Sequence, residues 1–345
     1  MNIIDYILSS TQRQCMPIAV YPGLEISGDT VKHLVTDCDA HYAAAMALCR
    51  RYDSPFVLTA MDLSVEAEVF GAGVVMSDDE VPTVSGRLLV SSEDIDRLKI
   101  PRGEFGRGEI ALQTVSKMHQ QQTRPEYVIG GMIGPYTLAA RLFGVSEALE
   151  LTLLDSVSSH NLLEKTTRYL IEYAEAFKSA GADAVCMAEP AAGLLWPEGL
   201  AEFSSAYIKR ISEAVEDDSF KIILHNCGCG LEHLQAVMDS GVKFLHFGEP
   251  LNMVEALKQV PSDVLLSGNL NPSDVFVTAK PEDTYRMTLV LLESSCEYRN
   301  FLLSSGCDIP PGTSLDNLDL FYQALCNFNS DRVSQYAGAL SNCSF

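Results

Sequence analysis

Histidine and cysteine side chains at short spacing can bind a metal ion, and the stretch LHNCGCG at 224–230 contains such a pair. In an extended strand, side chains two residues apart point to the same side, so His225 and Cys227 can contact one ion. An imidazole and a thiolate together are typical ligands of zinc. A buried histidine beside a small apolar cysteine explains the same residues without a metal. The pair alone therefore leaves both interpretations open.

A third candidate ligand is Cys307, in the stretch SSGCDIPP at 304–311, directly after an apolar run. If both stretches follow strands of one closed barrel, they lie at the same mouth. His225, Cys227 and Cys307 then supply three ligands and leave a fourth position open, as in catalytic zinc sites. Two alternatives remain: Cys307 can be an inert cysteine before a turn, and Cys229 competes with Cys227 as the second ligand.

The remaining cysteines form no recognisable motif. The ten cysteines lie at positions 15, 38, 49, 186, 227, 229, 296, 307, 326 and 343. No CxxC pair occurs, which argues against a zinc ribbon or a thioredoxin-type site. In a cytoplasmic protein these thiols are expected to be reduced.

Short apolar runs alternate with longer amphipathic segments along most of the chain. The runs that predict buried parallel strands are 17–21, 56–62, 127–134, 183–189, 221–227, 242–247, 264–269 and 301–306. The segments that predict helices are 41–52, 108–121, 147–180, 200–214, 231–240, 253–260, 281–295 and 315–328. Eight alternations predict an α/β fold, specifically a (β/α)8 TIM barrel. An open doubly wound sheet is the alternative, but this sequence lacks the Gly-rich phosphate-binding turn that such a fold has after its first strand.

Local signals refine this expectation. Ser146 is a candidate cap for the helix that follows it, and Pro281 is a suitable first residue of another. Gly181 is expected to end the helix that precedes the fourth strand. The segment 71–90 predicts a hairpin inserted after the second strand. No linker or repeat is found, so residues 1–345 are predicted to form a single domain.

The carboxyl ends of barrel strands carry active sites, so the residues at these ends are candidates for chemistry. In chain order they are Tyr21, Asp62, Gly134, Glu189, His225 with Cys227, Glu249, Asn269 and Cys307. We expect Asp62 to line the pocket, and Glu66 and Glu68 to be structural. His246 either supports the metal site or is a core histidine.

The net charge of −22 argues against nucleic acid, an anionic membrane or a polyanionic substrate as a partner. No stretch approaches the ~18 apolar residues of a membrane span, and the N-terminus lacks the features of a secretory signal. We therefore expect a cytoplasmic protein.

Several stretches, in order along nearly the whole chain, carry a family resemblance. They are MDLSVEAE (61–68), GPYTLA (134–139), AGAD (180–183), LHNCG (224–228), GNLNP (268–272) and GCDIPP (306–311). The chain resembles the uroporphyrinogen decarboxylase superfamily and, within it, the zinc-dependent methylcobamide:thiol methyltransferases. The HxC stretch together with the late cysteine is what resembles the methyltransferase branch.

The resemblance implies that His225, Cys227 and Cys307 bind Zn²⁺, which activates a small thiol such as coenzyme M. The methyl donor is then a methylcobamide on a corrinoid protein. Glu249 is a candidate for the fourth zinc position, and Tyr21 and Asn269 are candidate cofactor-binding residues. The stretch HFGE at 246–249 departs from the family's acidic pair, and Glu189 replaces a more usual aspartate.

Two other functions remain as alternatives. Uroporphyrinogen decarboxylases have an Arg-rich motif after the first strand, whereas residues 17–23 here read PIAVYPG, without an arginine. Asp62 falls where those enzymes keep an aspartate, but methyltransferases of the superfamily keep one too. The third possibility is a non-catalytic barrel that binds a corrinoid or zinc.

Overall fold

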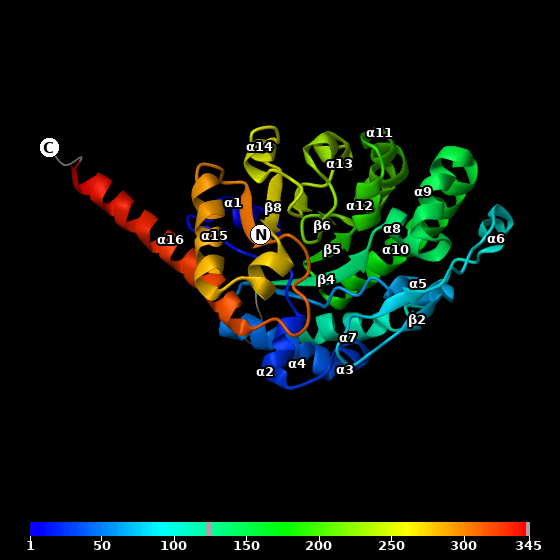
Figure 1. Cartoon of the computed structure of the whole chain (residues 1–345), viewed down its shortest axis with the longest axis horizontal. Coiled ribbons are helices and arrows are strands. Elements are labelled where there is room, and N and C mark those ends of the chain that lie inside the picture. Colours follow the sequence, from blue (N-terminus) through cyan, green and yellow to red (C-terminus); the bar gives the residue numbers. More distant parts are fainter. Residues whose placement is uncertain (122–125, 343–345) are drawn as a thin grey trace.

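A curled parallel sheet surrounded by helices forms the core of the computed structural model, which describes residues 1–121 and 126–342 (Figure 1). Seven parallel strands are hydrogen-bonded in the order β1-β4-β5-β6-β7-β8-β9. They are β1 Phe56–Leu58, β4 Tyr127–Ile133, β5 Ala184–Ala188, β6 Lys221–Asn226, β7 Phe244–Phe247, β8 Leu265–Leu270 and β9 Phe301–Ser305. Nearly every residue of these strands is buried, as expected for a sheet covered on both faces. The α/β class and seven of the predicted strands are thus confirmed.

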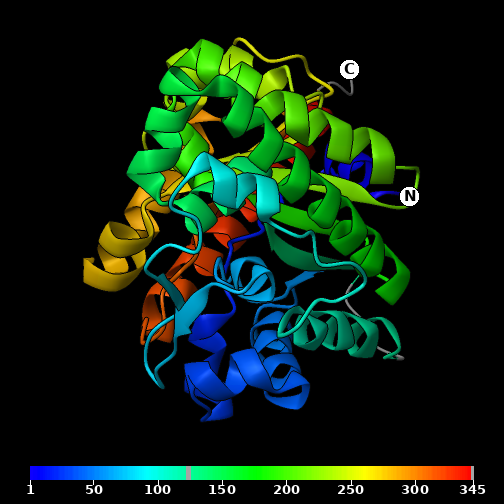
Figure 2. The ribbon, with the colours of Figure 1, turned by 90° about the vertical axis from the view of Figure 1, so that its right-hand side faces the viewer.

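The helices lie outside the sheet, as the two views at right angles show (Figures 1 and 2). The α-helices are α1 Ile3–Ser9, α2 Leu24–Ser27, α3 Val31–Thr36, α4 Cys38–Arg51, α5 Val65–Phe70, α6 Ser92–Arg97, α7 Gly108–His119, α8 Pro135–Phe143, α9 Val145–Leu154, α10 Ser156–Ala180, α11 Pro197–Leu200, α12 Ala206–Val215, α13 Leu234–Met238, α14 Met253–Leu257, α15 Pro281–Ser294 and α16 Leu315–Asn342. Short 3-10 or π segments are η1 Tyr21–Gly23, η2 Pro190–Leu194, η3 Ala201–Ser205, η4 Leu231–His233 and η5 Pro272–Thr278.

The strand predicted at 17–21 does not form. The segment before it follows β9 in parallel, with one bridge between Cys15 and Leu303 and a hydrogen bond from the Met16 N–H to the Leu303 carbonyl. Pro17 has no N–H to extend this ladder, and the Ile18 N–H donates to the Ser305 hydroxyl instead. Tyr21 already belongs to η1.

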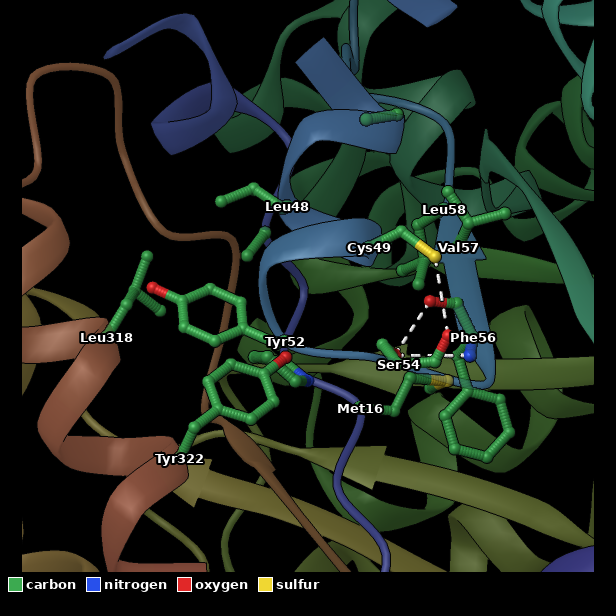
Figure 3. A pocket seen from close by; sticks show the side chains of 13 residues that line it. Met16, Leu48, Cys49, Tyr52, Ser54, Phe56, Val57, Leu58, Leu318 and Tyr322 are labelled. Carbon is green, nitrogen blue, oxygen red and sulfur yellow. Dashed lines mark hydrogen bonds between the residues drawn. The ribbon is translucent and has the colours of Figure 1, made fainter. Parts of the chain in front are cut away.

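A seam therefore separates this N-terminal segment from β1, and side chains fill it (Figure 3). The Ser54 hydroxyl satisfies the backbone of Phe56 on this side of β1. It accepts a hydrogen bond from the Phe56 N–H and donates one to the Phe56 carbonyl. Met16 and Pro17 face β1 across the seam, beside Tyr52 and Tyr322, whose rings stack 3.9 Å apart. A hollow of about 30 Å³ remains there. No β-bridge joins β1 to the N-terminal segment among the described residues.

Other local predictions have mixed outcomes. Within 71–90, β2 (Gly73–Val75) and β3 (Thr83–Ser85) pair antiparallel. The predicted helix 147–180 is interrupted, because Asp155 caps a new helix, α10, by accepting from the Ser158 N–H. Ser146 is not a cap: it lies inside α9, which begins at Val145. Gly181 ends α10 with a left-handed φ of 98°, as predicted.

Within the described part of the chain, no helix is both long and apolar enough to cross a membrane. All described cysteines are free thiols, and Cys343 lies outside the described residues.

Candidate metal centre and active site

The three predicted ligands meet at the carboxyl edge of the sheet. His225 is the next-to-last residue of β6, Cys227 directly follows that strand, and Cys307 lies two residues past the end of β9. One nitrogen of His225 and the two sulfurs lie within 4.8 Å of one another. His225 is buried, whereas both cysteines are partly accessible. A buried nitrogen with two reachable sulfurs fits zinc, which prefers imidazole and thiolate ligands.

The two thiols interact directly. A hydrogen bond from Cys307 lowers the pKa of Cys227, and the same hydrogen bond, together with burial, raises the pKa of Cys307 to about 12. The pair therefore accommodates one negative charge easily and a second one only at a cost. A divalent cation offsets that cost, because it stabilises both thiolates.

A chain of hydrogen bonds fixes the orientation of the His225 ring. The Ser304 hydroxyl donates to the Met16 carbonyl at 2.7 Å, so its oxygen accepts from Nε2 of His246 at 2.9 Å. Burial and the neighbouring His225 lower the pKa of His246, which keeps this ring neutral. Nδ1 of His246 is then the acceptor for Nδ1–H of His225 at 2.8 Å. This assignment leaves the Nε2 lone pair of His225 free for a metal ion.

The ligand group opens onto a cavity of about 200 Å³. Its described lining is mostly apolar and comes from strand ends, the β2–β3 region and α8. The lining residues are Ile18, Met61, Leu63, Val81, Pro82, Thr83, Arg141, Ala188, Pro190, His225, Cys227, Cys307 and Asp308. The volume suits a small molecule better than a macrocycle, since pockets for drug-sized ligands measure roughly 300–1,000 Å³.

Cys229, the rival ligand, does not belong to the group. It is fully buried, and burial raises its pKa to about 12. Among the described residues, the group of potential metal ligands consists of His225, Cys227 and Cys307.

Asp62 lies outside the cavity that the ligands share. One of its oxygens forms an ion pair with Arg107, and the other accepts from the N–H and hydroxyl of Ser64. Its neighbours Met61 and Leu63 line the cavity, while Asp62 borders a separate hollow of about 20 Å³. The carboxylate is thus occupied by structural partners, and its predicted catalytic role stays a prediction.

Glu249 and Asn269 are neighbours of the ligand group rather than members of it. The Glu249 carboxylate accepts from the Asn271 amide at 2.6 Å and is exposed. The Asn269 amide donates to the carbonyls of Gly248 and Leu251, which orders the loop that carries Glu249. In this structure, Asn269 therefore holds the loop in place.

Tyr21 is fully buried, and its hydroxyl donates to the Met61 carbonyl at 3.2 Å. Burial is the main cause that raises its pKa well above the usual value. Because the hydroxyl supports the strand end that forms a cavity wall, its predicted contact with a cofactor stays a prediction.

Glu189, another strand-end residue, caps α8. Its oxygens accept from the N–H groups of Tyr136 and Thr137 at 2.8 Å and from the Ser204 hydroxyl. A carboxylate at this place interacts favourably with the helix N-terminus. Position 134 requires a glycine, because a Cβ there would lie 2.4 Å from Oε2 of Glu189.

Glu66 is buried and gives a pH-dependent stability. One oxygen accepts from the Ile133 N–H, the other has no partner among the described residues, and burial raises the pKa to about 7 from 4.5. Since the folded state holds this proton more tightly, the free energy of unfolding falls as pH rises from about 4.5 to about 7. When the pH rises from 5 to 8, we expect the free energy of unfolding of Glu66→Gln to increase by about 2 kcal/mol relative to that of the parent chain.

Urea denaturation at the two pH values measures this gain. Glu282→Gln, at an exposed position of α15, is the control and should follow the parent chain at both. If Glu66→Gln also follows the parent chain, Glu66 does not titrate in this window.

Three residues of the site escaped the sequence analysis. Arg141 lies in the middle of a helix, Asp308 lies inside the motif that contains Cys307, and Ser304 lies in the interior of β9. Only Asp308 had a local signal, its position next to a candidate ligand. The other two are recognisable only once the fold brings β9 and α8 to the same region.

The chain matches known proteins over most of its length. The family model described as uroporphyrinogen decarboxylase (URO-D) matches residues 4–328. The methylcobamide:CoM methyltransferase MtbA of Methanosarcina acetivorans is 26% identical over 278 residues, which are 77% of this chain and 78% of that protein. A uroporphyrinogen decarboxylase of Psychromonas ingrahamii is 25% identical over 276 residues, which are 76% of this chain and 77% of that protein.

A solved structure shares the fold of this chain. A methyltransferase from Methanosarcina mazei has the same fold, with a TM-score of 0.85 at 20% identity, over 94% of this chain and 97% of that chain. Its fold agrees with the TIM-barrel-like arrangement of the sheet and helices. Because the family model spans nearly the whole described sequence, the chain belongs to the uroporphyrinogen decarboxylase (URO-D) family.

Proposed function

We propose that this chain is a zinc-dependent methyltransferase that moves a methyl group from a methylated corrinoid, carried by a corrinoid protein, to a small thiol. The observation that supports this proposal is the group of His225, Cys227 and Cys307 at the wall of a small cavity. Relatives of similar identity include both methyltransferases and decarboxylases, so the site has to separate the two activities.

The residues present fit zinc. His225, Cys227 and Cys307 would hold it, and its charge would supply the stabilisation that keeps a substrate thiol deprotonated near neutral pH. His246 keeps the His225 nitrogen lone pair available through the hydrogen bond between their rings. Glu249 remains the candidate for the fourth zinc position. In that role its carboxylate would give up the hydrogen bond from Asn271 and bind the metal instead.

The largely apolar wall of the cavity would limit the number of water molecules around the attacking sulfur. In the transfer, the sulfur forms a bond to the methyl carbon while the cobalt–carbon bond breaks, and that electron pair stays on cobalt. The thiol proton leaves to solvent. The corrinoid is too large for a cavity of about 200 Å³, so we propose that it docks over the mouth of a single barrel domain.

The decarboxylase alternative is less well supported by the cavity. A porphyrinogen with many carboxylates needs several cationic contacts, whereas Arg141 is the one lysine or arginine in the described lining. One imidazole and two thiols offer few strong hydrogen-bond donors for carboxylates.

The test is a transfer assay with zinc-supplemented protein, methylcobalamin and a small thiol. We expect the methyl thioether, detected by mass spectrometry, to form at least about tenfold faster than without protein, and Cys227→Ala to abolish this gain. Cys326→Ala, at an exposed thiol, should behave like the parent chain. Release of CO₂ from a porphyrinogen without any thioether would overturn the proposal.

A further inference from the structure

Arg141 is a charged residue in the largely apolar cavity that contains the candidate metal ligands. It lies in α8, the helix that follows β4, and its side chain lines the cavity together with His225, Cys227 and Cys307. The residue is only partly accessible. No hydrogen bond or ion pair satisfies its guanidinium group among the described residues, and burial alone lowers its pKa.

Other partly buried arginines of this chain do have partners. Arg107 contacts Asp62 and Glu68, and Arg13 donates to the carbonyls of Tyr298 and Phe301. The chain also has ample acid, with a net charge of −22, yet no carboxylate contributes to the pKa shift of Arg141. Asp308 borders the same cavity, but its own pKa shift involves burial, Cys307 and Ile309 and not Arg141.

A desolvated cation without a partner is costly in the free protein and is offset when an anion binds. A guanidinium group suits carboxylate, sulfonate and phosphate oxygens, to which it donates two parallel hydrogen bonds. An arginine kept without a protein partner inside a substrate cavity therefore indicates a ligand that carries the negative charge.

We propose that Arg141 binds an anionic group of the thiol substrate and so selects anionic over neutral thiols. This inference rests on the proposed function, because it assigns the cavity to the thiol. An anionic group is also present on the corrinoid, in its phosphodiester. The cavity volume of about 200 Å³ favours the small substrate, since a corrinoid macrocycle does not fit beside the ligand group.

Isothermal titration calorimetry in the absence of corrinoid tests the inference directly. The probes are 2-mercaptoethanesulfonate and 3-mercaptopropionate, which are anionic, and 2-mercaptoethanol, which is neutral and of similar length. We expect zinc-supplemented protein to bind the anionic thiols at least about tenfold more tightly, the value typical of a charged hydrogen bond. In Arg141→Gln this preference should fall to about one, with 2-mercaptoethanol binding unchanged.

Two variants sharpen the result. Arg141→Lys keeps the charge without the planar fork and should keep part of the preference. Arg286→Gln removes one positive charge from an exposed position and should leave the preference intact. Zinc content and the thermal midpoint, measured for each variant, show whether the ligand group and the fold are unchanged.

The outcomes separate the two proposals. If the preference is absent in the parent chain, or persists in Arg141→Gln, the role of Arg141 is wrong even when methyl transfer is observed. If Arg141→Gln changes only the KM for methylcobalamin, Arg141 binds the corrinoid and not the thiol, which also overturns the inference. An Arg141-dependent preference without methyl transfer supports the anion site and contradicts the proposed function.

Discussion

Replacement of Cys307 by alanine is expected to reduce bound zinc from about one ion per chain to a small fraction of that. The variant keeps only two of the three candidate ligands, and the missing one, Cys307, follows β9, which is far from β6 in the chain. Under the proposed function, methyl transfer should then fall to the rate of the reaction without protein, because the metal that would keep the thiol deprotonated is lost. Zinc analysis of reduced, dialysed protein and the transfer assay measure both effects.

Two further cysteine variants complete this experiment. Cys326→Ala, at an exposed position of α16, should retain zinc. Cys229→Ala separates the two candidate ligands of the LHNCGCG stretch, and we expect it to retain zinc as well, since Cys229 lies outside the ligand group. Full zinc in Cys307→Ala, with the fold intact by circular dichroism, would exclude the site as described.

Loss of the hydrogen-bonded partner of His225 is expected to weaken zinc binding by about 10- to 100-fold. In His246→Phe, the Nδ1–H of His225 loses its acceptor, so neither the tautomer nor the ring orientation is held. Competition with a chelator of known affinity gives the change in zinc affinity. The effect is on metal binding, so a variant that merely unfolds is recognised by its circular dichroism.

A matched pair of serines tests the same hydrogen-bonded chain one step further from the metal. The Ser304 hydroxyl accepts a hydrogen bond from His246. Ser267, on the adjacent strand β8, is equally buried, but its hydroxyl has no partner in the described part of the chain. We expect Ser304→Ala to weaken zinc binding severalfold and Ser267→Ala to leave it unchanged. Equal behaviour of the two variants would mean that the orientation of His246 does not matter for the metal.

The sequence predicted those features that depend on residues close together in the chain. Seven strands followed from their apolar runs, and the meeting of the three candidate ligands followed from residue type and position at strand ends. The strand at 17–21 was wrong because Pro17 has no N–H and Ser54 satisfies the backbone of the opposite strand. The helix 147–180 was wrong at Asp155, where a capping side chain outweighed a continuous amphipathic pattern.

The features that escaped prediction depend on distant segments. His246 was ambiguous because its partners His225 and Ser304 come from other strands, and their contact exists only in the curled sheet. The Arg141 guanidinium group has no hydrogen bond or ion pair among the described residues, and no local sequence pattern predicts this. Glu189 illustrates the opposite error, in which a strand-end acid suggests chemistry but serves a helix cap.

The seam beside β1 has a consequence for how the molecule tolerates motion. An unbroken backbone ladder runs from β6 through β7 and β8 to β9, and these strands supply or precede all three candidate ligands. The seam lies outside this ladder, where packing replaces strand pairing. Small opening motions of the curled sheet are therefore expected to concentrate at the seam, where they break no strand pairing. The candidate metal ligands then stay on a rigid arc of the sheet while the gap between its two edges adjusts.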